Sequence, residues 1–457
     1  MSLIIFNNSQ FLISSKLQKV KKFYSINVRS HFDIIIAGGG MVGTTLACAL
    51  GKNSRLANKK VLLLEGSSKK HWKLPENYSN RVVSINPGTH KLLNDIGAWK
   101  FIEKLRFTAV KRLEVWDAIS DAHITFGDSE EDNVSYVVEN DVILQSVSEE
   151  IKNVPNVNVM YDSKVKKYDL PILTENVVTV TMDNDDVFTC ELLLACDGVQ
   201  SLVRKSMKTD YLSWSYNQMG VVATLKLSDE IKNEIAWQRF LPTGPIALLP
   251  LTADQSSLVW STTPEQAKLL LNLREEEFVD ELNKAIWQKY DHHSVIQQAS
   301  SLFDTLLRFL NCPSGGIRQI PPKICGIIKE SRAAFPLGFG HSAQYIGQGV
   351  ALIGDAAHRV HPLAGQGVNL GFGDVVCLNE ILGEANISGA NLNDMSYLKD
   401  YETKRQQHNV PTMLAVESLH RLYNTEFTPV VLLRSLGLQA THVIEPLKKA
   451  IISQAAV

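Results

Sequence analysis

The stretch from residue 32 to residue 51 constrains the fold of this chain more than any other. It reads FDIIIAGGGMVGTTLACALG, which predicts a buried strand, a glycine turn and a helix with small residues on one face. A second continuous apolar run follows at residues 60–65. Strands that are apolar throughout and are joined by a helix are typical of a parallel sheet. The sequence therefore predicts an α/β fold.

The glycines of this turn fit the pattern GxGxxG between residues 38 and 43. Gly38 permits the tight turn, Gly40 lets a pyrophosphate approach the helix N-terminus, and Gly43 lets the helix lie close to the strand. Glu65 ends the second strand, where an acid can accept hydrogen bonds from ribose hydroxyls. We expect a dinucleotide with an unphosphorylated adenosine ribose to bind here. The alternative is a structural glycine turn followed by an unrelated acid.

Two further apolar runs end in polar or glycine residues. Residues 192–196 lead to Asp197 and Gly198, and residues 350–354 lead to Asp355. The segment after Asp355 opens a predicted helix and supplies six more candidate residues: Pro362, Gly365, Gln366, Gly367, Val368 and Asn369. FAD can satisfy all three strand ends, because its adenosine needs the first, its ribityl hydroxyls need an acceptor such as Asp355, and its ring needs flat backbone with free N–H groups. NAD needs only the first end.

Taken together, these motifs resemble those of the class A flavin-dependent monooxygenases of the p-hydroxybenzoate hydroxylase fold. Residues 361–374, HPLAGQGVNLGFGD, match the signature of the ubiquinone-biosynthesis hydroxylases within that class at every position. Further similar segments lie at residues 78–81, 138–142 and 237–250. The resemblance implies a Rossmann-like FAD-binding domain interleaved with an antiparallel-sheet substrate domain, and a helical C-terminal region.

The resemblance also implies an activity. Enzymes of this family use FAD and O2 to hydroxylate the C5 position of a polyprenylated hydroxybenzoate through a C4a-hydroperoxyflavin. Arg81 is expected to reach the FAD pyrophosphate, whereas Asp141 stands where related bacterial enzymes often have an arginine, so that flavin contact is in doubt here. Electrons are expected from a ferredoxin and its reductase, with NAD(P)H as the other candidate. A ubiquinone-biosynthesis complex is the expected assembly.

The order of the motifs predicts a chain that passes between domains more than once. We expect a first FAD-binding part at residues 31–104, a mixed substrate and FAD region at 105–190, an Asp-Gly segment at 191–206, a substrate-binding sheet at 207–330, the flavin-ring motif at 331–390 and a helical region at 391–457. In the last region Pro411, Pro429 and Pro446 are expected to break helices, and Thr428 to cap one. That helix either packs on the protein or lies on a membrane surface.

An apolar pocket is expected beside the flavin, because water must be kept from the reacting oxygen. Trp237, Leu248, Leu249 and Pro250 are candidates for its lining, and ordinary sheet core is the alternative for each. His358 and His361 have no third ligand nearby, so we expect no metal site. No residue is assigned as a catalytic base.

The first thirty residues differ in composition from the rest of the chain. They contain five Lys or Arg, six Ser and no acid, which is typical of a mitochondrial transit peptide. A frayed basic tail is the alternative. We therefore expect residues 1–30 to be a transit peptide and the protein to lie on the matrix side of the mitochondrial inner membrane, peripherally bound.

Composition excludes several other classes of protein. A net charge of −2 gives no footprint for nucleic acid. The six cysteines form no CxxC pair, so neither a zinc site nor a disulfide framework is expected. Two rival functions stay open: a non-catalytic prenyl-binding scaffold on the same fold, like the Rab GDP-dissociation inhibitors, and a flavin halogenase or dehydrogenase. The Trp-x-Trp-x-Ile motif of related halogenases is not present.

Overall fold

A computed structural model describes most of the chain. The described residues are 28–69, 71–120, 122–127, 133–171, 177–228, 232–288, 290, 319–444, 446 and 448–451. The predicted transit peptide lies outside them except for residues 28–30, which already belong to the first strand, β1 (Val28–Ala37). The ordered strand thus begins ahead of Phe32, where the apolar run starts.

The first sheet is the predicted parallel core. Its order is β18-β19-β11-β1-β2-β8, and strands β19, β11, β1, β2 and β8 run parallel. The remaining bounds are β2 (Val61–Leu64), β8 (Val157–Met160), β11 (Val187–Ala195), β18 (Ile346–Gly347) and β19 (Val350–Leu352). These strands read as continuous apolar runs because both faces are covered: Ile34, Ile35 and Ile36 are all fully buried.

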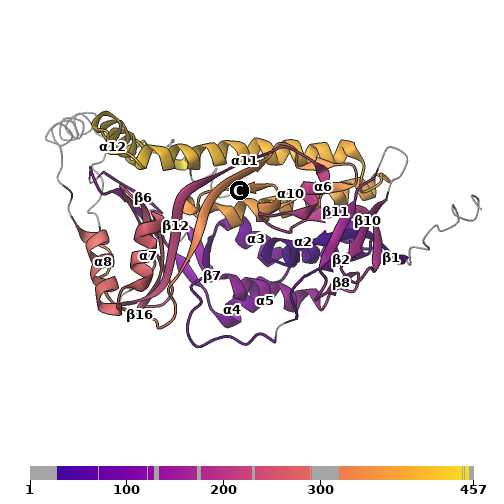
Figure 1. Ribbon diagram of the computed structural model, residues 1–457, viewed down its shortest axis with the longest axis horizontal. Helices are drawn as coiled ribbons and strands as arrows, with labels where there is room; N and C mark the ends of the chain where they lie inside the picture. The colour runs from indigo at the N-terminus through magenta and orange to yellow at the C-terminus, as the bar shows by residue number, and fades with distance from the viewer. Residues whose placement is uncertain are drawn as a thin grey trace, which may run out of the picture.

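Helices from distant parts of the chain pack on this sheet. The glycine turn leads into α2 (Met41–Lys52), which lies against α5 (Asn140–Ile151) and α10 (Gln366–Ile387), as Figure 1 shows. The hairpin β9 (Val165–Asp169) and β10 (Val178–Met182) extends the same sheet antiparallel to β11. Residues 178–182, which lie in the region expected to be mixed between substrate and FAD binding, therefore belong to the nucleotide-binding half.

The second sheet is mainly antiparallel, as predicted for the substrate domain. Its order is β20-β17-β12-β15-β14-β13-β5-β6, with β16 beside β12. The bounds are β5 (Arg112–Asp117), β6 (His123–Phe126), β12 (Tyr211–Leu227), β13 (Ile235–Leu241), β14 (Gly244–Pro250), β15 (Gln255–Thr262), β16 (Ile324–Ile327), β17 (Ala333–Ser342) and β20 (His358–Arg359). Helices α7 (Pro264–Asn272) and α8 (Glu275–Trp287) cover one of its faces (Figure 1).

A small third sheet lies between the two halves. It joins β3 (Val82–Ile85), β7 (Ser135–Glu139) and β4 (Thr108–Val110), and the short helices α3 (Pro87–Asp95) and α4 (Trp99–Leu105) follow β3. Alternation of chain segments between the sheets produces the interleaved domains that the sequence predicted.

Two long helices complete the C-terminal region. The first differs from expectation at its proline, and the second at its N-cap. Helix α11 (Met395–Tyr423) continues through Pro411, because one missing N–H leaves the packing of its buried face intact. Helix α12 (Thr428–Val443) has Phe427 at its N-cap, so the predicted cap at Thr428 is wrong: Thr428 is its first helical residue and Pro429 its second. Among the described residues, no helix has the length and apolarity needed to cross a bilayer.

Candidate functional site

The carboxyl ends of four parallel strands lie in register at one edge of the first sheet. Ala37 pairs with Leu64 on one side and with Ala195 on the other, and Ala195 pairs with Leu352. Neighbouring strands lie about 4.8 Å apart. The glycine turn, Glu65, the Asp-Gly segment and Gly354 therefore leave the sheet side by side, although more than three hundred residues separate the first from the last.

Each glycine of the first turn has a distinct steric reason. Gly38 has φ +102°, and a Cβ there would lie 2.4 Å from the carbonyl oxygen of Cys196. A Cβ on Gly43 would lie 2.0 Å from the carbonyl oxygen of Gly38, because the helix sits directly on the strand. A Cβ on Gly40 would meet no atom within 4 Å. Gly38 and Gly43 therefore serve the fold, and Gly40 leaves open space at the start of α2.

Glu65 closes the turn from the neighbouring strand. Its Oε2 accepts a hydrogen bond from the backbone N–H of Gly39 at 2.9 Å, and its Oε1 accepts one from Ser67 N at 2.7 Å. Each carboxylate oxygen has a second acceptor position. Glu65 therefore orients the glycine turn and still has the capacity to accept from hydroxyl groups.

Asp197 begins the second loop and is only partly satisfied by it. Its Oδ2 accepts from the backbone N–H groups of Leu202 at 2.8 Å and Val203 at 3.3 Å, at the start of helix α6 (Leu202–Met207). Its Oδ1 is buried without a hydrogen-bond partner among the described residues. Gly198 follows with φ +77° and open space where a Cβ would lie. A buried acceptor without a donor is unfavourable, so this oxygen is suited to a ligand hydroxyl.

Asp355 lies on a turn at the end of β19. Solvent reaches its side chain, yet surrounding protein is close enough that loss of hydration raises the pKa of its carboxyl group, against the opposing influence of His358 and Arg359. A carboxylate that is both accessible and crowded lies in a concave part of the surface. Arg204 links this turn to the Asp-Gly loop, because its guanidinium donates to Ala356 O at 2.7 Å and to Val199 O at 2.6 Å.

A buried charged network holds the Asp355 turn from behind. Asp374 on α10 accepts from Gly354 N at 2.9 Å and from Arg405 Nε at 2.7 Å, and its Oδ2 lies 2.6 Å from His358 Nε2. Asn409 donates to the same carboxylate. These charged neighbours hold the pKa of the fully buried Asp374 well below its usual range, despite the opposing effect of burial. The spacing of the motif included Asp374, but nothing local indicated Arg405 and Asn409 as its partners.

The flavin-ring motif forms a short 3-10 turn, Pro362–Ala364, followed directly by α10. Gly365 joins them with φ +62° and open space around it. No acceptor among the described residues takes the backbone N–H groups of Gln366, Gly367 and Val368, which the first turn of a helix always leaves free. Asn369 is different, because it is buried, at 4% exposure. Its side-chain oxygen accepts from Asn86 N and Thr89 Oγ1, and its nitrogen donates to Ser84 O and Gly365 O. Asn369 therefore holds α10 against β3 and α3.

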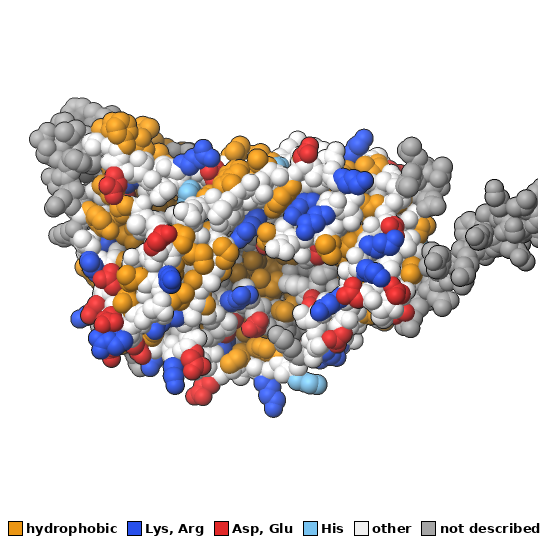
Figure 2. All heavy atoms as spheres, in the orientation of Figure 1, with side chains coloured by type: hydrophobic (Ala, Val, Ile, Leu, Met, Phe, Trp, Pro, Cys, Tyr) orange, Lys and Arg blue, Asp and Glu red, His pale blue; other side chains and the backbone are white. Residues whose placement is uncertain are grey.

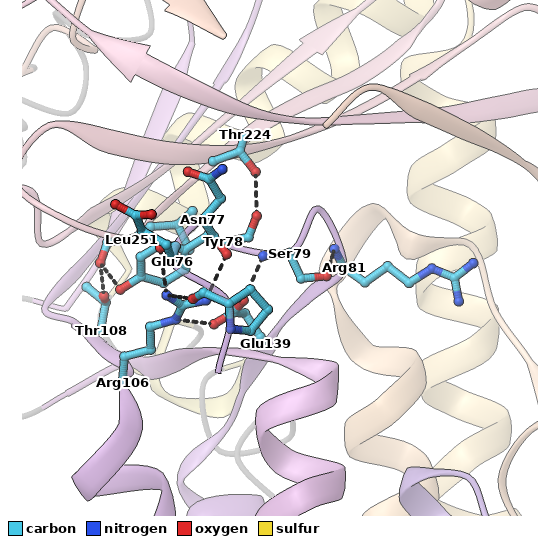
Figure 3. Close-up of polar contacts among 11 residues, drawn as sticks. Glu76, Asn77, Tyr78, Ser79, Arg81, Arg106, Thr108, Glu139, Thr224 and Leu251 are labelled. Carbon is cyan, nitrogen blue, oxygen red and sulfur yellow. Dashed lines mark hydrogen bonds and ion pairs between the residues drawn. The ribbon is translucent and has the colours of Figure 1, made fainter. Parts of the chain in front are cut away.

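Arg81 lies beyond the end of a tightly held loop. Glu139 accepts from Ser79 N at 2.6 Å and from two nitrogens of Arg106, whose guanidinium also covers the ring of Tyr78 at 4.0 Å. The guanidinium of Arg81 is exposed, makes no side-chain hydrogen bond with the described residues, and points away from this cluster (Figure 3). The hydrogen bonds to Glu139 fix the loop, and the positive charge of Arg81 at its end is available to a ligand. Asp141, at the start of α5, is exposed.

Comparisons with known proteins agree with this geometry. The family model described as "FAD binding domain" matches residues 31–303 and 335–413. A curated relative, ubiquinone biosynthesis monooxygenase COQ6, mitochondrial, of Xenopus tropicalis, is 48% identical over 93% of both chains. The Homo sapiens protein of the same name is 44% identical over 97% of this chain and 96% of its own. The chain belongs to this family of FAD-dependent monooxygenases.

Solved structures show the same fold in this enzyme class. PqsL, a probable FAD-dependent monooxygenase from Pseudomonas aeruginosa, superposes with a TM-score of 0.64 over 89% of this chain and 99% of its own, at 20% identity. The predicted fold class and enzyme class are confirmed, and FAD is the cofactor of the family. As a monooxygenase the protein takes an organic substrate, O2 and a reductant, which a non-catalytic scaffold would not.

A buried cluster of uncharged histidines supports the flavin-ring motif of this monooxygenase. His361 Nδ1 accepts from Leu363 N at 3.1 Å, so its Nε2 carries the proton and donates to Gln218 Oε1 at 3.1 Å. His420 Nε2 lies 3.0 Å from the same oxygen, while Gln218 Nε2 donates to Thr243 O. Burial, with a smaller contribution from His420, lowers the pKa of His361 to about 3. Sequence reasoning could not identify Gln218 or His420 as partners of His361, because they lie on distant elements.

Between the two halves lies a hollow, which Figure 2 shows near the centre of one face with hydrophobic side chains at its floor. The candidates for its lining divide by sheet face. Trp237 and Leu248 belong to the core under α7 and α8, so they are ordinary sheet core. Leu249 packs on the opposite face with Tyr78, Val110 and Val137. That opposite face is turned toward the nucleotide-binding half.

Proposed function

We propose that this monooxygenase binds FAD along the edge where the strand ends lie in register. In this arrangement the pyrophosphate lies at Gly40, Gly38 and Gly43 permit the turn and the close approach of α2 that form its site, and Glu65 accepts from the adenosine ribose. Arg81 approaches the pyrophosphate from the fixed loop beside Glu139. The in-register pairing of Ala37, Leu64, Ala195 and Leu352 carries the proposal, because it brings all three motifs to one edge.

The residues present fit the remaining parts of FAD. Asp197, with one buried oxygen that has no donor, and Gly198 suit a hydroxyl-bearing segment, and Asp355 is an accessible acceptor for the ribityl chain. The 3-10 turn that begins at Pro362 and the start of α10 present the flavin ring with backbone and free N–H groups. The residues on this flat surface are Gly365, Gln366, Gly367 and Val368. Asn369 acts from behind, by holding the helix in place.

Reduced FAD, when bound, supplies activation of O2 and transfer of one oxygen atom to an electron-rich ring carbon. The protein contributes position and dryness. The positive end of α10 favours negative charge on the reduced ring by about 0.3–2 kcal/mol. Leu363, Phe240 and Val416 pack together at the flavin-ring loop and exclude water there. No residue that touches the reacting atoms needs to carry a proton in this scheme, and none is assigned as a base.

We propose C5 of a polyprenylated hydroxybenzoate as the position hydroxylated, in line with the name of the relatives. A ferredoxin and its reductase, or NAD(P)H, would supply electrons. The named relatives are mitochondrial, and we assign this protein to the matrix side of the inner membrane, peripherally bound and within a ubiquinone-biosynthesis complex. The apolar outer surface of α12 and of the last turns of α11 supports membrane contact.

Two measurements test this function. Purified protein should be yellow, and Asp355→Ala should weaken FAD binding about tenfold or more, because it removes a hydrogen bond to a charged group. Fluorescence titration of the apoprotein with FAD measures this loss. Cells that lack the protein should accumulate a prenylated ring with one hydroxyl too few, detected by mass spectrometry. Folded, colourless protein that never takes up FAD would contradict the cofactor, and unchanged quinone precursors would contradict the reaction.

A further inference from the structure

Strand β13 presents different residues to its two sides. Trp237 and Leu241 pack into the core under α7 and α8. Arg239 points the same way, because its guanidinium donates to Ala285 O at 3.0 Å and Ile286 O at 2.7 Å at the end of α8. Side chains alternate along a strand. Ala236, Gln238 and Phe240 therefore lie on the opposite face, toward the nucleotide-binding half.

The neighbours of Gln238 on that face are packed against two different walls. Ala236 clusters with Val110 and Val137 of the small third sheet, where Tyr78 joins them. Phe240 clusters with Leu363 of the flavin-ring loop and stacks on Tyr423 of α11 at 3.8 Å between ring centroids. Gln238 lies between these two contacts. It therefore faces the interval between the small sheet and the flavin-ring loop.

Gln238 belongs to a row of side chains that crosses four strands. The ladder pairs Gln238 with Ala247, Ala247 with Val259, and Val259 with Val222. Gln238, Ala247 and Val259 are half-buried, and Val222 is 6% exposed. Beyond these four strands the ladder continues from Gln238 to Val115 of β5, which is 8% exposed. Gln238 is thus a single polar group within an apolar row, and the small Ala247 beside it leaves room in front of it.

The amide of Gln238 is not used by the fold. It forms no hydrogen bond with any residue of the described chain, and it is not sealed away from solvent. By contrast, Gln218 on the same sheet binds two histidines and Thr243. The side-chain amide of a half-buried residue that is free to both donate and accept, within an apolar row, is suited to a neutral hydroxyl on a flat apolar ligand.

We propose that Gln238 is a specificity-determining residue that hydrogen-bonds the phenolic hydroxyl of the aromatic substrate, while Ala247, Val259 and Val222 contact the ring. This rests on the proposed function. A carboxylate is a poorer match, because a neutral amide does not compensate the cost of burying a charge. The site would therefore distinguish a phenol from an ether of the same shape, as sites built around a hydroxyl do.

The test compares two ligands on the FAD-loaded protein: a 4-hydroxybenzoate with a short prenyl chain and its 4-methoxy counterpart. Binding is followed by the change in flavin absorbance. Wild-type protein should bind the phenol about tenfold more tightly than the ether, which corresponds to one hydrogen bond. Gln238→Met, of similar length, should lose this preference and retain its FAD. The matched control is Gln266→Met on α7, half-buried on the other side of the sheet, which should keep the preference.

Each other outcome is decisive. A Gln238→Met protein that still prefers the phenol tenfold would overturn the assignment of Gln238 alone. Loss of FAD from Gln238→Met would overturn it too, because the residue would then support the fold. Wild-type protein that binds FAD but neither ligand would contradict the proposed reaction itself, and the role of Gln238 with it.

Discussion

At the scale of single residues, the site is surrounded by buried polar groups whose charge state is set by their neighbours. His358 and Arg405 hold the pKa of Asp374 below its usual range against the effect of burial, whereas burial lowers the pKa of His361 and keeps it neutral. Both act on backbone: Asp374 on Gly354 and His361 on Leu363. The residues that would touch FAD are mostly glycine and backbone, so these buried side chains fix their positions.

His361 predicts a specific dependence of stability on pH. Its pKa is about 3 in the folded protein, against 6.5 for an ordinary histidine. Below pH 6.5 the unfolded chain therefore binds a proton that the folded chain does not, and the free energy of unfolding falls by up to about 1.4 kcal/mol per pH unit until pH approaches 3. Above pH 6.5 His361 is neutral in both the folded and the unfolded chain, so it no longer makes the free energy of unfolding depend on pH.

The variant His361→Asn isolates this effect. Asparagine can accept from Leu363 N as His361 does, but it does not titrate. Urea unfolding with saturating FAD should show wild-type stability falling more steeply between pH 6.5 and 5 than that of His361→Asn, so that the two curves converge. Histidines with lowered pKa that lie outside this cluster, such as His341, affect both proteins equally. Parallel curves would show that His361 is not the group that titrates.

At the scale of elements, the strand–turn–helix at β1 and α2 separates fold from cofactor binding. A methyl group at position 43 would lie 2.0 Å from Gly38 O, so Gly43→Ala should cost about 1–3 kcal/mol of stability, measured by urea unfolding, and displace α2.

Gly40 has backbone angles that any residue adopts, φ −70° and ψ −175°, and a Cβ at this position would meet no atom within 4 Å. Gly40→Ala should therefore unfold at the wild-type urea concentration as apoprotein, yet bind FAD at least about tenfold more weakly, because the methyl group occupies the pyrophosphate space. Equal FAD affinity in Gly40→Ala would contradict this placement.

The same element shows how much of the molecule could be predicted from sequence. Strand β1, the glycine turn, α2 and the acid at Glu65 follow from local periodicity and steric rules, and so does the in-register arrangement of strand ends in a parallel sheet. The helix through Pro411 could not be predicted, because tertiary packing overrides the local preference. Gln218, His420 and Arg405 have no local signature. Their roles exist only after the sheets and α11 bring distant segments together.

At the scale of the whole molecule, α11 and α12 form one border of the structure and combine an anchored face with an exposed one (Figure 1). Arg434 pairs with Asp117 through two nitrogens at 3.0 and 3.1 Å, both side chains fully buried, and this fastens α12 to the second sheet. Outward, Leu414, Phe427 and Leu433 are 59%, 65% and 67% exposed. One face of α12 therefore packs on the protein, as one of the two expectations has it, and the other face is apolar and exposed to solvent.

The exposed face is also nearly free of charge. Between residues 411 and 443, all of which the structure describes, the exposed charged side chains are Arg421 and Glu426, since Glu417 and Arg434 are buried. Such a surface suits the headgroup boundary of a bilayer, where the hydrophobic contribution scales with the apolar area inserted.

Two point substitutions test this orientation without removing the anchor at Arg434. Phe427→Glu with Leu433→Glu should reduce cosedimentation with phosphatidylcholine–cardiolipin vesicles about tenfold or more, because two inserted side chains of roughly 1.5–3 kcal/mol each are replaced by charges. Ile387→Glu is the matched control: Ile387 is also 67% exposed but ends α10, next to Asn386, which binds the Arg55 turn of the nucleotide-binding half. It should sediment like wild type. If the double variant still binds vesicles fully while retaining FAD, the surface of α12 is not the membrane contact, and a partner protein becomes the better occupant of this surface.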